Sequence, residues 1–131
     1  MPKKSASPKS PKSPKKIQQW IQDALAAAKA QDLAVLDVRK VADFTDYMVI
    51  VTGTSNRHVQ STADKVIEKL REHARRPLGV EGMAAGDWVL IDFGEVVVHV
   101  MRAQTRDFYN LEKLWGDGKI VRGKEGVRSE E

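Results

Sequence analysis

The sequence contains no cysteine, and this absence excludes disulfide bonds and any thiolate chemistry, catalytic or metal-binding. No apolar run approaches the roughly 20 residues that a membrane-spanning helix needs. The N-terminus lacks the apolar segment of a secretory signal. These absences predict a protein of the cytoplasm with no membrane partner, because cytoplasmic thiols stay reduced and disulfides are rare there.

Acidic residues are missing from the N-terminus, and the basic charge of the chain is concentrated there. Residues 1–16 carry six Lys and no Asp or Glu, whereas the whole chain has 22 Lys and Arg against 18 Asp and Glu. Without those six Lys the remainder has a net charge of −2. A nucleic-acid-binding body would have the opposite sign. The tail also lacks aromatic side chains for base stacking, so we expect it to attract nucleic acid weakly at most.

The composition divides the chain into a single domain and two tails. Residues 1–16 are Ser, Pro and Lys repeats that cannot bury enough apolar surface to offset chain entropy, and we predict that they are disordered. Residues 117–131 are rich in Gly and charge and are predicted to form a flexible polar tail. The segment 17–116 between them has the length of one small domain.

Apolar spacing predicts the element order α-β-β-α-β-β-α within this domain. A small mixed sheet covered by helices, an α+β fold, is the expected architecture. Residues 47–52 (YMVIVT) form a nearly continuous apolar run, which predicts an interior strand covered on both faces. The predicted helices are 16–31, 56–75 and a last one ending near 115; the predicted strands are 33–38, 47–52, 87–93 and 95–101.

The two strands of residues 87–101 are expected to form a hairpin with two different faces. A two-residue loop at Phe93 and Gly94 pairs Leu90 with Val97 and gathers Val and Ile side chains on one face. A three-residue loop ending in Gly94 is the alternative, because Phe fits poorly where φ must be positive, and it would reverse the faces. We prefer the two-residue loop because it buries one clean apolar face.

The second face of this hairpin mixes apolar, aromatic and charged side chains. Apolar anchors beside a few charges are typical of a protein-binding patch. The alternative is that the last helix covers the face and turns it into a second core. The side chains concerned are Trp88, Leu90, Asp92, Glu95, Val97, His99 and Met101.

Catalytic and metal-binding patterns are weak in this chain. The turn at residues 52–55 precedes a helix and could bind phosphate through backbone amides, but a Ser-capped turn is the commoner explanation. A working nucleotidyltransferase would need paired Asp residues, and the sequence contains no D-x-D. His58, His73 and His99 lie in different predicted elements without metal-ligand spacing. We therefore predict no catalytic site, no metal and no cofactor.

The segment 87–115 resembles the ribosomal silencing factor family (RsfS, also called Iojap-like). That family has a Trp-led strand, an Asp-aromatic-Gly-acidic turn, a V-V-V-H-V strand and an R-x-x-Y-x-L-E-x-L-W helix. Upstream, the turn at 52–55 followed by Arg57 and His58 also matches, and the resemblance covers roughly residues 17–116. The matching residues are Trp88; Asp92, Phe93, Gly94 and Glu95; 96–100; and Arg106, Tyr109, Leu111, Glu112, Leu114 and Trp115.

The resemblance implies a non-enzymatic regulator of translation with a nucleotidyltransferase-like fold that lacks the catalytic residues. Such a protein binds the large ribosomal subunit through large-subunit protein fourteen and sterically blocks subunit joining when nutrients are scarce. It also implies a homodimer when free, consistent with a small domain that leaves apolar surface uncovered. A residual nucleotide-binding protein is the alternative. The expected partner-binding residues are Trp88, Leu90, Asp92, Val97, His99, Met101, Tyr109 and Trp115.

Overall fold

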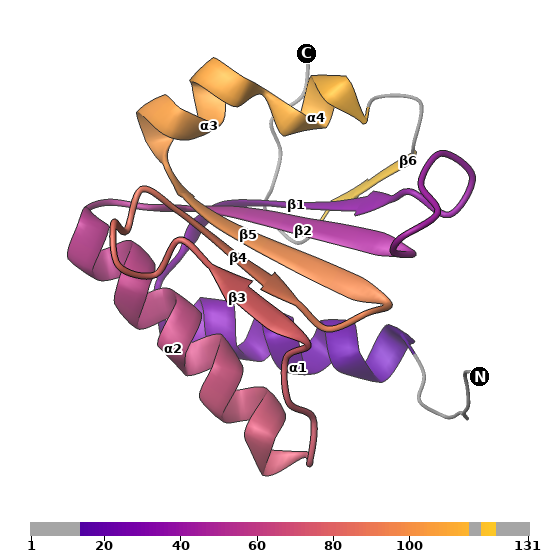
Figure 1. Cartoon of the computed structure of the whole chain (residues 1–131), viewed down its shortest axis with the longest axis horizontal. Coiled ribbons are helices and arrows are strands. Elements are labelled where there is room, and N and C mark those ends of the chain that lie inside the picture. The colour runs from indigo at the N-terminus through magenta and orange to yellow at the C-terminus, as the bar shows by residue number, and fades with distance from the viewer. Residues whose placement is uncertain (1–13, 116–118, 123–131) are drawn as a thin grey trace.

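The computed structural model describes residues 14–115 and 119–122 as an α+β fold, a six-stranded mixed sheet with helices on both faces (Figure 1). The strand order in the sheet is β3-β4-β5-β2-β1-β6. The elements are α1 (Pro14–Ala27), β1 (Gln31–Asp37), β2 (Tyr47–Gly53), α2 (Asn56–Glu72), β3 (Gly79–Glu81), β4 (Trp88–Asp92), β5 (Val96–Arg102), α3 (Ala103–Tyr109), α4 (Leu111–Leu114) and β6 (Lys119–Arg122).

The central strands β2 and β5 run parallel, and all other neighbouring strands in the sheet pair antiparallel. Each residue of β2 except Tyr47 is buried, which confirms the prediction of an interior strand covered on both faces. Because β2 and β5 are parallel, the chain must cross over between them. It does so through α2, β3 and β4.

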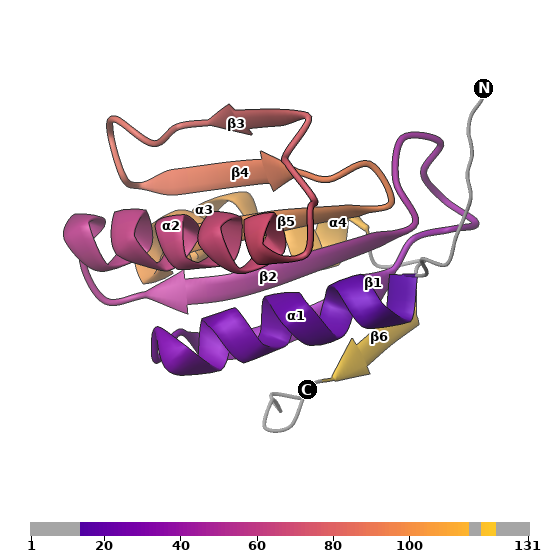
Figure 2. The same ribbon diagram turned by 90° about the horizontal axis from the view of Figure 1, so that it is seen from below.

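Helices α1 and α2 cover one face of the sheet, as the view from below shows (Figure 2). Their apolar stripes pack onto the Val and Ile side chains of the central strands, and these residues form the main core. The hairpin contributes Val89, Ile91, Phe93, Val96, Val98 and Val100 to this core. The predicted clean apolar face of the hairpin is therefore confirmed.

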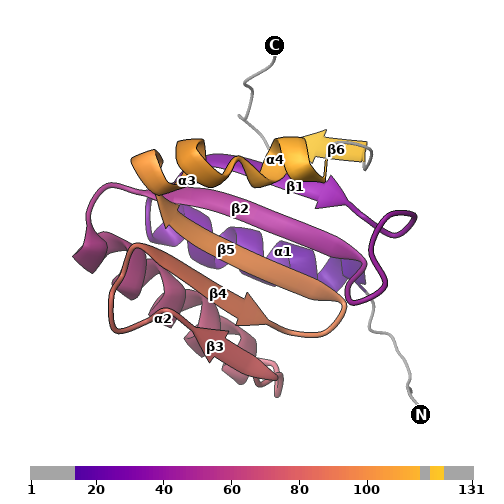
Figure 3. The ribbon, with the colours of Figure 1, turned by 45° about the horizontal axis from the view of Figure 1, so that its top comes forward.

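Helices α3 and α4 lie on the opposite side of the sheet from α1 and α2 (Figure 3). A second, smaller core lies on this side, with Trp88 and Trp115 packed against it. The mixed face of the hairpin is therefore partly covered, as the second interpretation of the sequence proposed. The buried members of this second core are Ala34, Leu36, Val38, Met48, Ile50, Met101 and Leu111.

The hairpin register differs from the preferred prediction by two residues. Leu90 lies opposite His99, and Asp92 lies opposite Val97. The Phe93 N–H donates to the Val96 carbonyl at 2.9 Å, so the loop residues are Gly94 and Glu95. Gly94 has φ +91, which glycine adopts without strain, whereas Phe93 directly follows β4 with its ring buried. Since the shift is even, each side chain keeps its predicted face.

The element order also contains three features absent from the prediction. The short strand β3 pairs with β4, the last helix divides at Asn110, and β6 pairs with β1 within the segment predicted to be a flexible tail. Asn110 is left-handed (φ 46, ψ 60), and this conformation ends α3. A three-residue strand carries too little alternation to be recognised from sequence. Of the tail 1–16 that was predicted to be disordered, residues 1–13 lie outside the described part, and residues 14–16 belong to α1.

Candidate partner-binding surface

The structure separates the predicted partner-binding residues by their accessibility. Val97, His99 and Met101 are buried, on the face of the sheet that carries α3 and α4, and have almost no exposed area for a partner. Trp88, Leu90, Asp92 and Trp115 are half-buried, and Tyr109 is exposed. The three buried residues can therefore support a binding surface but cannot form one, and the role of the remaining five stays a prediction.

Large apolar side chains are exposed on and beside the two short helices. Phe108 is 80% exposed, Leu114 68% and Tyr109 51%. Phe44, in the β1–β2 loop, is 57% exposed. We call these four residues, with Trp88 and Trp115, the aromatic surface.

The aromatic rings of this surface form two groups that are in contact within each group. At the α3 end, the Tyr109 ring lies 4.8 Å from the Trp88 ring and 4.9 Å from the Phe108 ring, measured between centroids. At the α4 end, the rings of Phe44 and Trp115 meet edge to face at 5.6 Å. These distances are typical of favourable aromatic pairs. Phe44, Phe108 and Leu114 were not among the predicted partner-binding residues. Phe44 lies in a loop far from the motif segment, and nothing in the sequence indicated that it would lie near Trp115.

Trp88 is held by a hydrogen bond to a buried histidine. Its indole Nε1–H donates to His99 Nδ1 at 3.0 Å, so the proton of the neutral imidazole is assigned to Nε2. Burial lowers the pKa of His99 to about 4, and the ring is neutral at physiological pH. His99 Nε2 has no hydrogen-bond partner in the described part of the chain. His99 thus fixes the orientation of the Trp88 ring from below.

A buried arginine connects the two short helices to the sheet. Arg106 Nη1 donates to the Asp32 carbonyl at 2.6 Å and to Thr52 Oγ1 at 2.9 Å. Its Nε and Nη2 donate to the two carboxylate oxygens of Glu112 at 3.3 and 2.6 Å. Arg106 belongs to the motif of the last helix, but sequence reasoning gave it no role.

The carboxylates of the hairpin turn are engaged within the chain. Asp92 Oδ1 accepts the Gly94 N–H at 2.8 Å, which stabilises the turn. Glu95 forms an ion pair with Arg75 at 3.0 Å. Burial and the nearby Glu95 raise the pKa of Asp46. Asp92 remains half-buried and can still face a basic partner.

The turn at residues 52–55 serves as a helix cap. Ser55 Oγ accepts the His58 N–H at 3.0 Å, and His58 Nδ1 accepts the Thr54 N–H at 2.9 Å. The other ring nitrogen of His58 donates to the Ala28 carbonyl at 2.7 Å. Two amides that could cradle a phosphate are thus already bonded within the chain.

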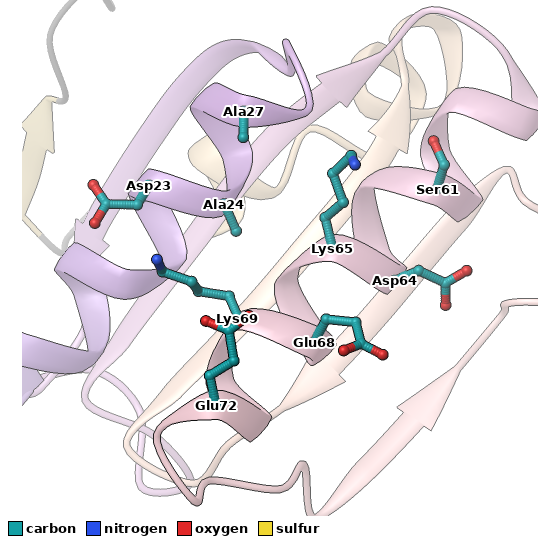
Figure 4. A pocket seen from close by; sticks show the side chains of 9 residues that line it. All are labelled: Asp23, Ala24, Ala27, Ser61, Asp64, Lys65, Glu68, Lys69 and Glu72. Atoms are coloured by element: carbon teal, nitrogen blue, oxygen red, sulfur yellow. The ribbon is translucent and has the colours of Figure 1, made fainter.

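The opposite side of the molecule has a groove between α1 and α2 with a volume of about 460 Å³ (Figure 4). Its lining is small or charged and contains no aromatic side chain, so it lacks anchors of the kind found on the aromatic surface. Within residues 14–115 and 119–122, no cluster of His, Asp or Glu could hold a metal ion. None of the helices in the same residues is long and apolar enough to span a membrane.

Comparison with known proteins gives the family. A family model described as "Ribosomal silencing factor during starvation" matches residues 11–131. The chain belongs to the ribosomal silencing factor family. This confirms the resemblance inferred from the motifs of residues 87–115.

Two curated relatives carry the name of this family. The ribosomal silencing factor of Chromobacterium violaceum is 43% identical over 97 residues, which cover 74% of this chain and 80% of the relative. The one from Haemophilus influenzae is 37% identical over 97 residues, covering 74% of this chain and 95% of the relative. A crystal structure of a Chromobacterium violaceum protein superposes with a TM-score of 0.78 at 37% identity, covering 88% of this chain and 97% of that one.

Proposed function

We propose that this silencing factor binds the large ribosomal subunit through the aromatic surface and prevents the small subunit from joining. The exposure of Phe108, Tyr109 and Leu114 on the short helices α3 and α4 carries this proposal. Exposed apolar clusters are uncommon on monomeric proteins and are typical of binding sites. Aromatic side chains also supply much of the affinity at protein interfaces.

The proposed mechanism is steric and needs no chemical step. A protein bound where the small subunit docks excludes it, because two bodies cannot occupy the same site. The proposed contact is large-subunit protein fourteen, and a basic surface on that protein would complement Asp92 and Asp107, which lie near the aromatic residues in sequence. We propose that the protein acts in the cytoplasm and lowers translation when nutrients are scarce.

The free protein is proposed to be a homodimer. The exposed rings of Phe44, Phe108 and Tyr109 would be covered in a symmetric pair until the ribosome replaces the second copy. Light scattering should then give twice the monomer mass of 14.6 kDa at micromolar concentration. A monomer mass over the whole concentration range would contradict the dimer.

Residual nucleotide binding, which a nucleotidyltransferase-like fold would suggest, is the alternative function. The amides of Thr54 and His58 are bonded within the chain, and this disfavours a phosphate site there. We expect no heat when Mg²⁺ and nucleoside triphosphates are titrated into the protein in a calorimeter. Saturable heat at micromolar concentration would favour the alternative.

Co-sedimentation with purified large and small subunits tests the main proposal, and two leucines provide a matched comparison. Leu114 is 68% exposed on α4, whereas Leu78 is 75% exposed beside β3, outside the aromatic surface. We expect Leu114→Ala and Tyr109→Ala to weaken large-subunit binding at least tenfold, which is about 1.4 kcal/mol each. Leu78→Ala should leave the affinity unchanged.

Binding alone does not establish a block of joining. Adding the protein to large subunits before small subunits should therefore reduce the fraction of joined ribosomes, and Tyr109→Ala should restore it. Equal binding to both subunits, or equal effects of the two leucine variants, would contradict the proposed surface.

A further inference from the structure

The helices that carry part of the aromatic surface have little apolar anchorage of their own. In α3 and α4 only Arg106 and Leu111 are buried. The two helices are also short, with seven and four residues, and helices of this length are unstable without tertiary contacts. The position of Tyr109 and Trp115 therefore depends on a small number of contacts.

The left-handed residue Asn110 interrupts the helix between Tyr109 and Leu111. A continuous helix would fix the relative position of its two halves through backbone hydrogen bonds, but this joint weakens that constraint. The Arg106–Glu112 ion pair spans this joint, and two guanidinium nitrogens donate to the two carboxylate oxygens. A bidentate ion pair of this kind fixes the relative orientation of the two side chains as well as their distance.

The same guanidinium also ties this pair to the sheet through an irregularity of β1. The β1–β2 register shifts between Gln31 and Ala34, and Asp32 in this bulge has φ +52, an unfavourable conformation for a side-chain-bearing residue. The carbonyl of Asp32 accepts from Arg106 Nη1, which also reaches Thr52 on β2. Arg106 thus joins four elements: α3, α4, β1 and β2.

We propose that Arg106 is a positioning residue of the partner-binding surface: it sets α3 against α4 so that Tyr109 and Trp115 face the partner together. Arg106 is itself buried, so it would act on a partner through the helices that it joins. The role in binding rests on the proposed function. The ordering of the two helices belongs to the free protein and can be measured without the ribosome.

Hydrogen exchange of the free protein gives the first test. In Arg106→Lys the single ammonium group cannot reproduce the bidentate ion pair with Glu112. Local unfolding of α3 and α4 should therefore become more frequent. We expect the amides of Asn110, Leu114 and Trp115 to exchange at least tenfold faster, while those of β2 and β5 are unchanged. Glu112→Gln keeps the shape and loses the charge, and it should give a smaller change in the same amides.

Arg75→Lys is the matched control. Arg75 also pairs with a glutamate, at 3.0 Å and half-buried, but it ties the segment after α2 to the hairpin turn. This variant should leave exchange in α3 and α4 and the large-subunit affinity unchanged. Equal effects of the two arginine variants would show a general loss of stability and would overturn the positioning role.

Large-subunit affinity gives the second test, through the coupling of two variants. We expect Arg106→Lys to reduce affinity at least tenfold. Tyr109→Ala should then cost much less in the Arg106→Lys background than in the wild type, because a ring that is no longer positioned contributes little. Additive effects of the two substitutions would overturn the proposal, and so would reduced affinity with unchanged exchange.

The two proposals fail in different ways. If the wild-type protein does not sediment with large subunits, the proposed function is wrong, and the exchange rates alone decide whether Arg106 orders α3 and α4. If the wild type binds but Arg106→Lys binds equally well, the proposed function stands and the positioning role is refuted.

Discussion

Acidification should destabilise the protein through His99. Burial lowers the pKa of this imidazole from 6.5 to about 4, so the folded protein resists a proton that the unfolded chain accepts. The contribution of neutral His99 to the free energy of unfolding is therefore full above about pH 6.5. It is lost as the pH falls towards 4, because the unfolded state binds more protons in this window. With about 1.4 kcal/mol per pKa unit, the loss amounts to about 3 kcal/mol.

Urea unfolding between pH 7 and pH 4 measures this loss, with His99→Asn as the control. The Asn amide oxygen can accept the Trp88 indole N–H in place of Nδ1, and it does not titrate. Other groups, including Asp46 with its raised pKa, titrate in both proteins and cancel in the difference. We expect the wild type to lose about 3 kcal/mol more than the variant. A difference that stays constant with pH would refute the reasoning.

Three further predictions concern Trp88, a turn glycine and the basic tail. Trp88→Phe removes the donor to His99 and should cost about 1 kcal/mol of unfolding free energy, whereas Trp88→Ala, which also removes the ring, should cost about 3 kcal/mol; an unchanged stability of Trp88→Phe would contradict the hydrogen bond. Gly82→Ala should lower the melting temperature markedly, because φ is +84 and the new Cβ would lie 2.0 Å from the Trp88 carbonyl oxygen, while Gly79→Ala, with open space around it, is the tolerated control. Deleting residues 1–13 should weaken large-subunit binding slightly and flatten its salt dependence; complete loss at moderate salt would show that the tail is the recognition element.

Local patterns were sufficient to predict most helices, most strands and the faces of the hairpin. The alternation of Val and Ile in residues 88–100 places one set of side chains on one face whatever lies around it. The register was missed because it depends on which residue takes positive φ, and Gly94 at the first loop position shifts the pairing by two. An even shift leaves the faces unchanged, so the core prediction survived the error.

Whether a strand face is covered cannot be predicted from alternation. The mixed face of β4 and β5 was expected to meet a partner, but α3 and α4 lie over part of it, and Val97, His99 and Met101 are buried on this face. The same pattern of aromatic and apolar residues fits both outcomes. The decision rests on contacts between segments distant in sequence, such as the bond from Arg106 to the carbonyl of Asp32, 74 residues away.

Arg106 also shows why some structurally important residues cannot be recognised from sequence patterns. A single Arg on a helix is normally solvated, because a guanidinium is rarely buried unless it is paired. Here its partners are a carboxylate beyond a helix break and a carbonyl exposed by a bulge, and neither feature can be recognised from residue type. The result is an exchange of roles between the two faces of α3 and α4. The polar side chain of Arg106 lies inside and holds the helices, whereas the aromatic side chains, usually the core of such a structure, lie outside, where we propose that they meet a partner.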